Sequence, residues 1–391
     1  MKEGWEYIDF KDVFPIKMGK TPPRGDKSSW DEKKETNNKW VSIADISNNE
    51  GKVIKDTKEY ISDSAASKIY KVSKGSLLMS FKLSIGRMAF AGDDLYTNEA
   101  IISIPEGEKY ILRFIYYYLL SYDWLSLTEG NEKVKGATLN KTSIGKIQLP
   151  VLPLSEQQSI VDYLDSAFAK IDAMKANAEK ALNEAKALFQ ASLKEMLEPK
   201  EGWECKKIKD IGSVIAGTTP NTNVAEYWNG TLCWISPAEL DGSHYLYDSK
   251  KKITEAAVKA KSLKLLPEGT VILSSRAPIG KVVINKVPTY CNQGFKCVVC
   301  GSEIYNEFLY WWFWGKKDYL NSLGTGATFK EISKKVVEEI TIPFPPLPEQ
   351  QSIVEYLDSL KSKVDKLQAN YDKISQECDA LKQSILRQVF E

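Results

Sequence analysis

The chain has 391 residues, of which 43% are hydrophobic and 27% charged, and its formal net charge is +1. This length predicts two domains of ordinary size, and this composition is typical of globular proteins. No apolar run reaches the roughly 18 residues of a membrane-spanning helix, and no signal peptide is expected. The near-neutral charge argues against a generic electrostatic nucleic-acid binder, although local basic patches are compatible with it. The six cysteines have no regular spacing, which favours a cytoplasmic location over a disulfide framework.

The main motifs of the chain occur twice. Glu3-Gly4-Trp5-Glu6 returns as Glu201-Gly202-Trp203-Glu204, and Glu156-Gln157-Gln158-Ser159 returns as Glu349-Gln350-Gln351-Ser352. A period of about 195 residues is the length of a domain and far too long for a solenoid repeat. The sequence therefore predicts the duplication of a whole domain together with its connector.

Shorter motifs between these anchors also match in order, while the stretches that separate them differ. The matched pairs are Gly19-Lys20-Thr21-Pro22 with Gly217-Thr218-Thr219-Pro220, Trp40–Asp45 with Trp234–Glu239, Gly75–Ser80 with Gly269–Ser274, Ile85-Gly86-Arg87 with Ile279-Gly280-Lys281, Asn98-Glu99 with Asn292-Gln293, and Gly136-Ala137-Thr138 with Gly326-Ala327-Thr328. This pattern indicates one scaffold that carries two different variable surfaces.

Each globular part is expected to mix strands and helices. Gly75–Ser80 and Gly269–Ser274 are short apolar runs after a turn glycine, which predicts strands. Phe114–Leu120 and Phe308–Trp314 are aromatic runs too wide for one strand face. We interpret them as buried helices, because a continuous apolar sequence has no polar face. The alternative is a platform on which nucleic-acid bases stack.

A long helix is predicted after each globular part, because residues 156–198 and 349–390 contain no glycine or proline. Apolar residues in the second segment alternate in steps of three and four, the spacing of a coiled-coil seam. They are Leu357, Leu360, Val364, Leu367, Tyr371, Ile374, Cys378, Leu381 and Ile385. The corresponding residues of the first segment are Leu164, Ala167, Ile171, Met174, Ala178, Ala181, Ala185, Leu188 and Ser192. We expect the two helices, each roughly 65 Å long, to pack on each other.

The expected architecture is α+β, with two tandem mixed α/β domains separated by two long antiparallel coiled-coil helices. The predicted boundaries are 1–152 and 200–346 for the domains, and 153–199 and 347–391 for the helices. If a pseudo-two-fold axis relates the halves, the helices run antiparallel and the C-terminal end returns to the first domain.

The sequence resembles a known family at the start of both helices. Pro153–Val161 and Pro346–Val354 are similar to the conserved regions of the specificity subunit of type I restriction–modification systems. The upstream loops Gly136–Asn140 and Gly326–Lys330 resemble the loop that closes the target-recognition domains of that family. The resemblance covers the whole chain, in the order recognition domain, helix, recognition domain, helix.

The resemblance implies a DNA-binding subunit without catalysis of its own. Each domain would recognise one half of a split, asymmetric site in double-stranded DNA, and the helix pair would set the unspecified spacer. Two methyltransferase subunits would dock on the helices and domains, and restriction subunits would complete the nuclease. S-adenosylmethionine, ATP and Mg²⁺ would then be bound by these partners, and no cofactor or membrane by this chain.

No catalytic motif is recognised in the residues themselves. Gly19-Lys20-Thr21 matches the end of a phosphate-binding loop, but Phe14 occupies the place of its first glycine. The Pro-Pro-aromatic motif of amino-methyltransferases is absent. His244 is the sole histidine, and Glu50 takes its place in the first half, so a nucleophile activated by histidine is not expected.

A zinc site is a weighed alternative in the second half. Cys297 and Cys300 have ligand spacing, and Cys291 with Cys233 or His244 could complete the set. The corresponding residues of the first half are Thr97, Ser103 and Glu106. The fold therefore does not require a metal there, and the segment also predicts a strand in which cysteine is an ordinary apolar residue.

Recognition of DNA bases requires Arg, Lys, Asn, Gln or Thr side chains on turns and helix ends. The candidates in the first half are Lys20, Thr21, Arg24, Lys27, Lys82, Arg87, Lys133, Lys135, Asn140 and Lys141. Those in the second half are Thr218, Thr219, Asn221, Arg276, Lys281, Thr328 and Lys330. Lys82 and Arg276 are the most specific pair, because both follow a matched strand and differ between the halves. Ordinary surface turns also carry such residues, and Lys250-Lys251-Lys252 is more typical of a solvated face or a phosphate contact.

Two other classes of function stay open at this point. The first is an enzyme whose motif is not recognised, and the second is a tether whose two ends bind proteins. Turnover by the isolated chain would distinguish the enzyme, and failure to enrich a split DNA sequence would distinguish the tether.

Overall fold

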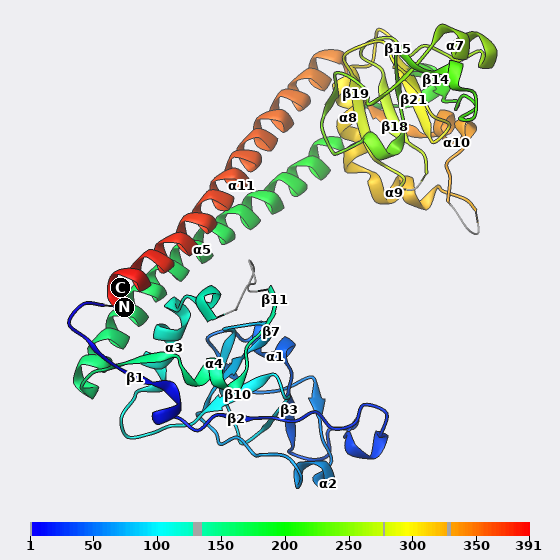
Figure 1. The fold of residues 1–391 in the computed structure, drawn as a ribbon. Coiled ribbons are helices and arrows are strands. Elements are labelled where there is room, and N and C mark those ends of the chain that lie inside the picture. The colour runs from blue at the N-terminus through cyan, green and yellow to red at the C-terminus, as the bar shows by residue number, and fades with distance from the viewer. Residues whose placement is uncertain (1, 128–134, 277, 327–329) are drawn as a thin grey trace. The chain divides into compact units, whose positions relative to one another are not determined.

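The computed structural model describes residues 2–127, 135–276, 278–326 and 330–391 (Figure 1). The described residues fall into two compact units. Unit 1 comprises Met1–Asn177 and Lys373–Glu391, and unit 2 comprises Ala178–Asp372. Each unit thus contains a globular part and segments of both long helices. Within the described ranges, no helix is long and apolar enough to cross a membrane.

The described part of unit 1 contains a five-stranded sheet in the order β2-β10-β6-β8-β4. The strands are β2 (Lys17–Met18), β10 (Ile101–Ile104), β6 (Leu77–Ser80), β8 (Met88–Ala91) and β4 (Val53–Ile54). Neighbouring strands are antiparallel, except that β4 runs parallel to β8. A further sheet has the order β5-β3-β9. Its strands are β5 (Glu59–Tyr60), β3 (Lys39–Val41) and β9 (Tyr96–Thr97).

Unit 2 repeats both sheets. The described strands β14 (Gly212–Ala216), β21 (Phe295–Cys300), β18 (Val271–Ser274), β19 (Val282–Asn285) and β16 (Tyr245–Leu246) form a five-stranded sheet in that order. The second sheet has the order β17 (Lys251–Ile253), β15 (Trp228–Ile235) and β20 (Tyr290–Cys291). As in unit 1, the last strand of the larger sheet is parallel to its neighbour. The duplication inferred from sequence is therefore a duplication of topology, and the predicted tandem α+β fold is confirmed.

Each unit also has a strand pair that joins its beginning to its end. In unit 1, β1 (Glu6–Asp9) pairs with β12 (Gln148–Val151). A separate pair in this unit joins β7 (Lys82–Ser84) to β11 (Lys135–Thr138). In unit 2, β13 (Glu204–Lys207) pairs with β22 (Thr341–Phe344). The repeated Glu-Gly-Trp-Glu segments thus lie next to the strands that lead into the long helices.

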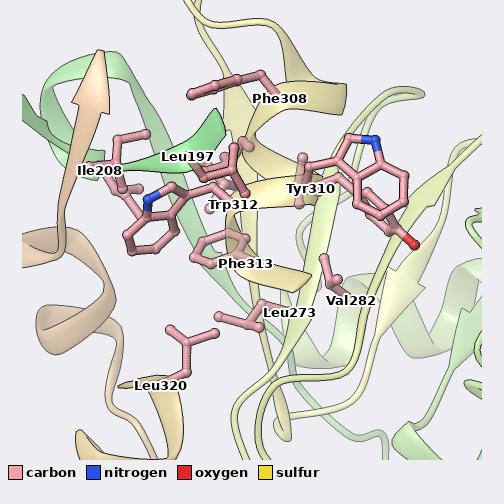
Figure 2. Packing of buried hydrophobic residues seen from close by; sticks show 14 of the residues in the cluster. Leu197, Ile208, Leu273, Val282, Phe308, Tyr310, Trp312, Phe313 and Leu320 are labelled. Atoms are coloured by element: carbon pink, nitrogen blue, oxygen red, sulfur yellow. The ribbon is translucent and has the colours of Figure 1, made fainter. Parts of the chain in front are cut away.

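The two aromatic runs are helices buried in the cores. The short helices of unit 1 are α1 (Ile43–Asn48), α2 (Asp63–Ala66), α3 (Leu112–Ser121) and α4 (Lys141–Gly145). Those of unit 2 are α6 (Ile208–Ile211), α7 (Glu255–Lys261), α8 (Asn306–Gly315), α9 (Lys317–Ser322) and α10 (Lys334–Glu339). Figure 2 shows Phe308, Trp312 and Phe313 of α8 among the other buried apolar side chains of its cluster. Rings at this depth cannot stack on bases, so the interpretation of these runs as core helices is confirmed.

A buried glutamine attaches each long helix to its own globular part. Gln157 has no exposed surface. Its amide oxygen accepts from the Ile111 N–H at 2.9 Å, and its amide nitrogen donates to the carbonyls of Lys109 (2.9 Å) and Leu152 (2.8 Å). Burial of an amide is favourable only when its donors and acceptors are satisfied in this way.

Gln350 makes the same connections in unit 2. It accepts from the Tyr305 N–H at 2.8 Å and donates to the carbonyls of Glu303 (3.1 Å) and Pro345 (2.9 Å). The Trp203 indole also donates to Glu349 at 3.1 Å. The two motifs that repeat most clearly in the sequence are therefore in contact in this unit.

The long helices are α5 (Leu154–Leu197) and α11 (Leu347–Phe390), and they pack antiparallel within each unit (Figure 1). In unit 1, Lys175 pairs with Asp379 at 3.4 Å and Lys382 pairs with Asp172. In unit 2, Lys186 Nζ donates to Gln368 at 2.7 Å. The end of α11 returns to unit 1, where Phe390 contacts Trp5, Phe114 and Tyr118. The predicted antiparallel direction is confirmed.

The structure corrects the predicted helix seam. Leu164, Ile171, Leu357 and Val364 are buried, and Leu360, Ile374 and Ile385 are partly buried. Five predicted seam residues are exposed instead, namely Met174 (60%), Leu188 (58%), Leu381 (47%), Leu367 (36%) and Ala181.

The error has a geometric cause. From Ala178 and Ala185 the buried stripe continues to the residue four positions later, and these residues, Leu182 and Phe189, are each 3% exposed. Steps of three and four residues both return to nearly the same helix face. The apolar pattern does not reveal the correct step, because two lysines, Lys175 and Lys382, occupy it. Their apolar stems can cover the seam while their charges pair at its edge.

Replacement of Gln350 by alanine should strongly destabilise unit 2. It would leave the Tyr305 N–H and the carbonyls of Glu303 and Pro345 without this partner, at about 1–3 kcal/mol for each group that stays buried. Denaturant unfolding and hydrogen exchange of the Tyr305 amide would measure the loss. The matched control is Gln351→Ala at the exposed neighbouring position, which should change stability by less than about 0.5 kcal/mol. Equal effects of the two substitutions would contradict this role.

Candidate nucleic-acid interface

Two turns that are distant in sequence meet at the surface of each unit. In unit 1, the hydroxyl of Thr21 donates to the Glu99 carboxylate. In unit 2, the hydroxyl of Thr219 donates to the Gln293 side-chain oxygen. We call Thr21, Asn98 and Glu99 turn cluster 1, and Thr219, Asn292 and Gln293 turn cluster 2.

The first turn of each cluster is possible only because it begins with glycine. A Cβ atom on Gly19 would lie 1.9 Å from the carbonyl oxygen of Thr97, and one on Gly217 would lie 2.0 Å from that of Asn292. This close approach lets the next residue bond to the second turn. The N–H of Lys20 donates to Thr97 O, and the N–H of Thr218 donates to Cys291 O, both at 2.8 Å.

A buried tryptophan holds each first turn from below. The indole N–H of Trp40 donates to the Lys20 carbonyl, and that of Trp234 donates to the Thr218 carbonyl, both at 3.2 Å. Each of these rings meets a second tryptophan edge to face, with centroids 5.2 Å apart for Trp30 and 5.1 Å apart for Trp228. The anchoring of the turn is thus the same in both units.

The backbone of one basic residue lies beside each turn cluster. The Phe81 N–H donates to Ala100 O at 2.9 Å, and the Ser275 N–H donates to Gly294 O at 2.8 Å. These bonds place Lys82 and Arg276, the next residues along the chain, near Glu99 and Gln293 respectively. The most specific sequence candidates therefore lie at equivalent places.

The Glu99 carboxylate is ionised at neutral pH. Partial burial opposes its ionisation, but the hydrogen bond from Thr21 and the charge of Lys82 outweigh this and hold the pKa of Glu99 below its usual range. Glu99 is therefore a hydrogen-bond acceptor, whereas Gln293 carries both a donor and an acceptor.

The remaining candidates are in different environments. The exposed ones are Lys20, Arg24, Lys27, Arg87, Asn140, Lys141, Thr218, Asn221 and Lys330. Some of the set are engaged within the chain. The Arg24 guanidinium pairs with Glu59, Arg87 pairs with Glu50, and Lys281 donates to the Leu240 carbonyl at 2.7 Å. Their contact with DNA stays a prediction, as it does for the whole set.

Two asparagine candidates stabilise local backbone. Asn140 caps α4 by accepting from the Ser143 N–H at 2.8 Å, and Asn221 accepts from the Asn223 N–H at 3.0 Å. Lys133, Thr328 and the side chain of Lys135 lie outside the described residues.

The structure shifts the alignment of the closing loops. The Leu139 N–H donates to Phe81 O, and the Ile332 N–H donates to Ser275 O, both at 2.9 Å. Ser333 then caps α10 as Asn140 caps α4. The structural counterpart of Asn140 is therefore Ser333.

Three cysteines of unit 2, Cys291, Cys297 and Cys300, are packed as apolar residues. The sulfur atoms of Cys291 and Cys297 lie 3.4 Å apart in the core, and burial raises the pKa of Cys300 to about 12. Cys233 donates to Asp248 at 3.3 Å, and His244 contacts Glu307 at 2.7 Å. Among the described residues, no group of three or more His, Cys, Asp and Glu side chains is placed to hold a metal ion.

A second candidate surface lies on the long helices. Exposed apolar side chains occupy equivalent positions in the two units, and we call each set an apolar stripe. The stripe of unit 1 is Tyr163, Met174 and Leu381, and that of unit 2 is Tyr356, Leu367 and Leu188. Met174 and Leu381 each follow by two residues an acidic partner of an interhelical ion pair. Two residues correspond to about 200° of helix rotation, so stripe and ion pairs occupy different flanks.

Comparison with known sequences reveals relatives of one kind. Residues 2–184 and 200–376 match the family described as type I restriction modification DNA specificity domain. The chain is 44% identical over 169 residues to the MjaIX specificity subunit of Methanocaldococcus jannaschii, and 31% identical over 269 residues to the EcoR124I/EcoR124II specificity subunit of Escherichia coli. These matches cover 41% and 66% of this chain, but only 39% and 65% of the relatives.

Solved structures share the fold over the full chain. A chain from a study of assembly and conformational transition in a type I restriction–modification system matches with a TM-score of 0.78 and 18% identity, over 100% of this chain and 98% of that one. The HsdS subunit from Thermoanaerobacter tengcongensis matches with a TM-score of 0.63 and 18% identity, over 100% and 97% of the two chains.

Replacement of Gly19 by alanine should disrupt turn cluster 1. The new methyl group would collide with backbone atoms of Thr97, which cannot rotate away, and overpacking of this kind costs about 1–3 kcal/mol. Gly25→Ala is the control in the same loop, because a Cβ there meets no atom within 4 Å. Denaturant unfolding should show a loss for Gly19→Ala and a change below about 1 kcal/mol for Gly25→Ala. A neutral Gly19→Ala would contradict the close approach.

Proposed function

Because the chain belongs to the family of type I restriction modification DNA specificity domains, we propose that it recognises a two-part, asymmetric sequence in double-stranded DNA. Each unit would bind one half of that sequence. The observation that supports this most is the pair of turn clusters, in which the same backbone anchoring presents different exposed groups. Base recognition depends on such groups, and two different half-sites require two different sets.

The basic residues around the clusters would supply the phosphate contacts. The backbone of Lys82 lies beside turn cluster 1 and that of Arg276 beside turn cluster 2. The exposed Lys20 precedes Thr21 in the chain. Phosphate contacts set the position and orientation of a protein on the duplex, while base contacts carry the sequence information. The overall charge of +1 is compatible with this arrangement, because the basic groups are local to the turns.

The long helices would connect the two recognition units and determine the unspecified spacer between the half-sites. Each is a continuous helix of 44 residues. A helix without glycine or proline in its interior resists bending, which suits an element that sets a distance.

The apolar stripes support a scaffold role for the same helices. Exposed apolar side chains that repeat at equivalent positions are typical of a surface that binds a partner. Because the stripe occurs once in each unit, we expect two copies of the same partner, namely methyltransferase subunits, with restriction subunits joining the assembly. S-adenosylmethionine, ATP and Mg²⁺ would be bound by those subunits, and this chain would contribute recognition without catalysis.

Selection from a random pool of DNA duplexes tests the recognition role. The full chain, co-expressed with methyltransferase subunits of its host, should enrich two short sequence blocks separated by a spacer of fixed length. Enrichment of a single block, or of none, would contradict the proposal and favour a protein tether. DNA cleavage or methyl transfer by the isolated chain would instead favour an enzyme.

A double substitution tests the scaffold role. Met174→Asp combined with Leu381→Asp places two charges in the stripe of unit 1, and burial of unpaired charges in an interface is costly. Co-purification of the methyltransferase subunits should fall, while the melting temperature of the isolated chain should change little because both side chains are exposed. Ala169→Asp adds the same charge on another exposed face of α5 and should leave assembly intact. Full assembly of the double variant would count against docking at the stripe.

A further inference from the structure

We infer that Glu99 and Gln293 are base-reading residues, with Glu99 accepting a hydrogen bond from a cytosine amino group and Gln293 pairing with an adenine. This inference rests on the proposed DNA recognition and deepens it by naming a specificity-determining residue in each unit. The sequence candidates did not include either residue, although Asn98-Glu99 and Asn292-Gln293 were recognised as a matched pair.

The two residues are structurally equivalent and accessible. Both side chains are exposed, and each follows an asparagine that closes the turn on the backbone. The Asn98 side chain accepts from the Ala100 N–H at 2.7 Å, and the Asn292 side chain accepts from the Gly294 N–H at 2.5 Å. The structural difference between the positions is therefore concentrated in the terminal group, which is a carboxylate in one unit and an amide in the other.

The side chains are held before any ligand binds. The Thr21 hydroxyl engages Oε2 of Glu99, and the Thr219 hydroxyl engages Oε1 of Gln293. The threonines themselves lie on the glycine turns that the buried tryptophans anchor. An exposed polar group that is already oriented loses little conformational freedom on binding, which is the condition for selective recognition.

The chemistry of the terminal groups determines the base. An ionised carboxylate only accepts hydrogen bonds, and in the major groove the amino group of cytosine is the donor that it matches. A carboxylate that faces phosphate alone would weaken DNA binding, so its presence at this position is favourable only against a donor. The Gln293 amide offers a donor and an acceptor together, which match N7 and the amino group of adenine.

The neighbouring basic residues fit this arrangement. Lys82 lowers the electrostatic cost of the Glu99 charge near DNA, since its own charge acts on that carboxylate. In unit 2, a Cβ on Gly294 would lie 3.1 Å from the Arg276 Nε atom, so the guanidinium group passes alongside the residue that follows Gln293. Each base-reading side chain thus has a cation beside it that is suited to a phosphate.

Reciprocal substitutions test the inference, because glutamate and glutamine have nearly the same shape. The full chain with its methyltransferase subunits would be used to select from duplexes in which both half-sites and their flanks are random. For Glu99→Gln, one position in one half-site should change its preference from cytosine to adenine by about tenfold or more. For Gln293→Glu, one position in the other half-site should change from adenine to cytosine. The second half-site should be unchanged in each case.

Two controls separate recognition from folding and from charge. Glu99→Ala should lose the preference at that same position while the rest of the split sequence is retained. Glu108→Gln removes a carboxylate from another exposed position of unit 1 and should leave every position unchanged.

The outcomes are distinct. A split sequence that is identical for the wild type, Glu99→Gln and Gln293→Glu would overturn the inference and leave the proposed function standing. A wild-type protein that enriches no split sequence would overturn the proposed function itself, and the inference with it. A change in both half-sites from one substitution would also overturn the assignment of one residue to one half.

Discussion

The organisation of each unit depends on a single buried amide side chain at the start of its long helix. Gln157 and Gln350 have no exposed surface, and each bonds to the backbone that precedes its core helix and to the backbone that leads into its long helix. A glutamine can do this because one planar group carries both an acceptor oxygen and an NH2 with two donor hydrogens. The attachment therefore tolerates little rotation, and a recognition surface on the globular part has a defined orientation relative to the segments of α5 and α11 in its own unit.

The two units have diverged in charge at this attachment while keeping its geometry. In unit 1, Arg113 of α3 pairs with Asp165 of α5 at 2.8 Å. In unit 2, the corresponding residues are the acids Glu307 and Asp358, and His244 contacts Glu307 at 2.7 Å. Burial raises the pKa of Asp358, although the indole N–H of Trp311 donates to it and opposes this rise. The contact between core helix and long helix thus carries opposite charges in unit 1 and two acids in unit 2, and the copies are no longer interchangeable there.

The turn clusters differ between the units only in the side chains that they expose. The contacts that anchor them to the globular part are the same in both units. Glycine, tryptophan and backbone contacts are preserved between Gly19 and Gly217 and between Trp40 and Trp234. A rigid and conserved support lets a single terminal group change without a change of shape. In the apolar stripes, by contrast, the exposed residues themselves are alike. Tyr163 and Tyr356 retain both position and exposure, as expected where two units bind the same partner.

The sequence by itself determined the duplication, the two long helices, the core role of the aromatic runs and the antiparallel helix direction. These features follow from local periodicity and from the order of repeated motifs, which the chain displays without reference to distant contacts. Only the tertiary structure shows which residues of the two long helices form their contact. Steps of three and four residues lie on nearly the same face, and the apolar pattern does not reveal the step that Lys175 and Lys382 occupy. The tertiary structure also decided that Glu99 meets Thr21 and that Gln293 meets Thr219, because hydrogen bonds between residues more than 70 positions apart leave no mark in local sequence pattern.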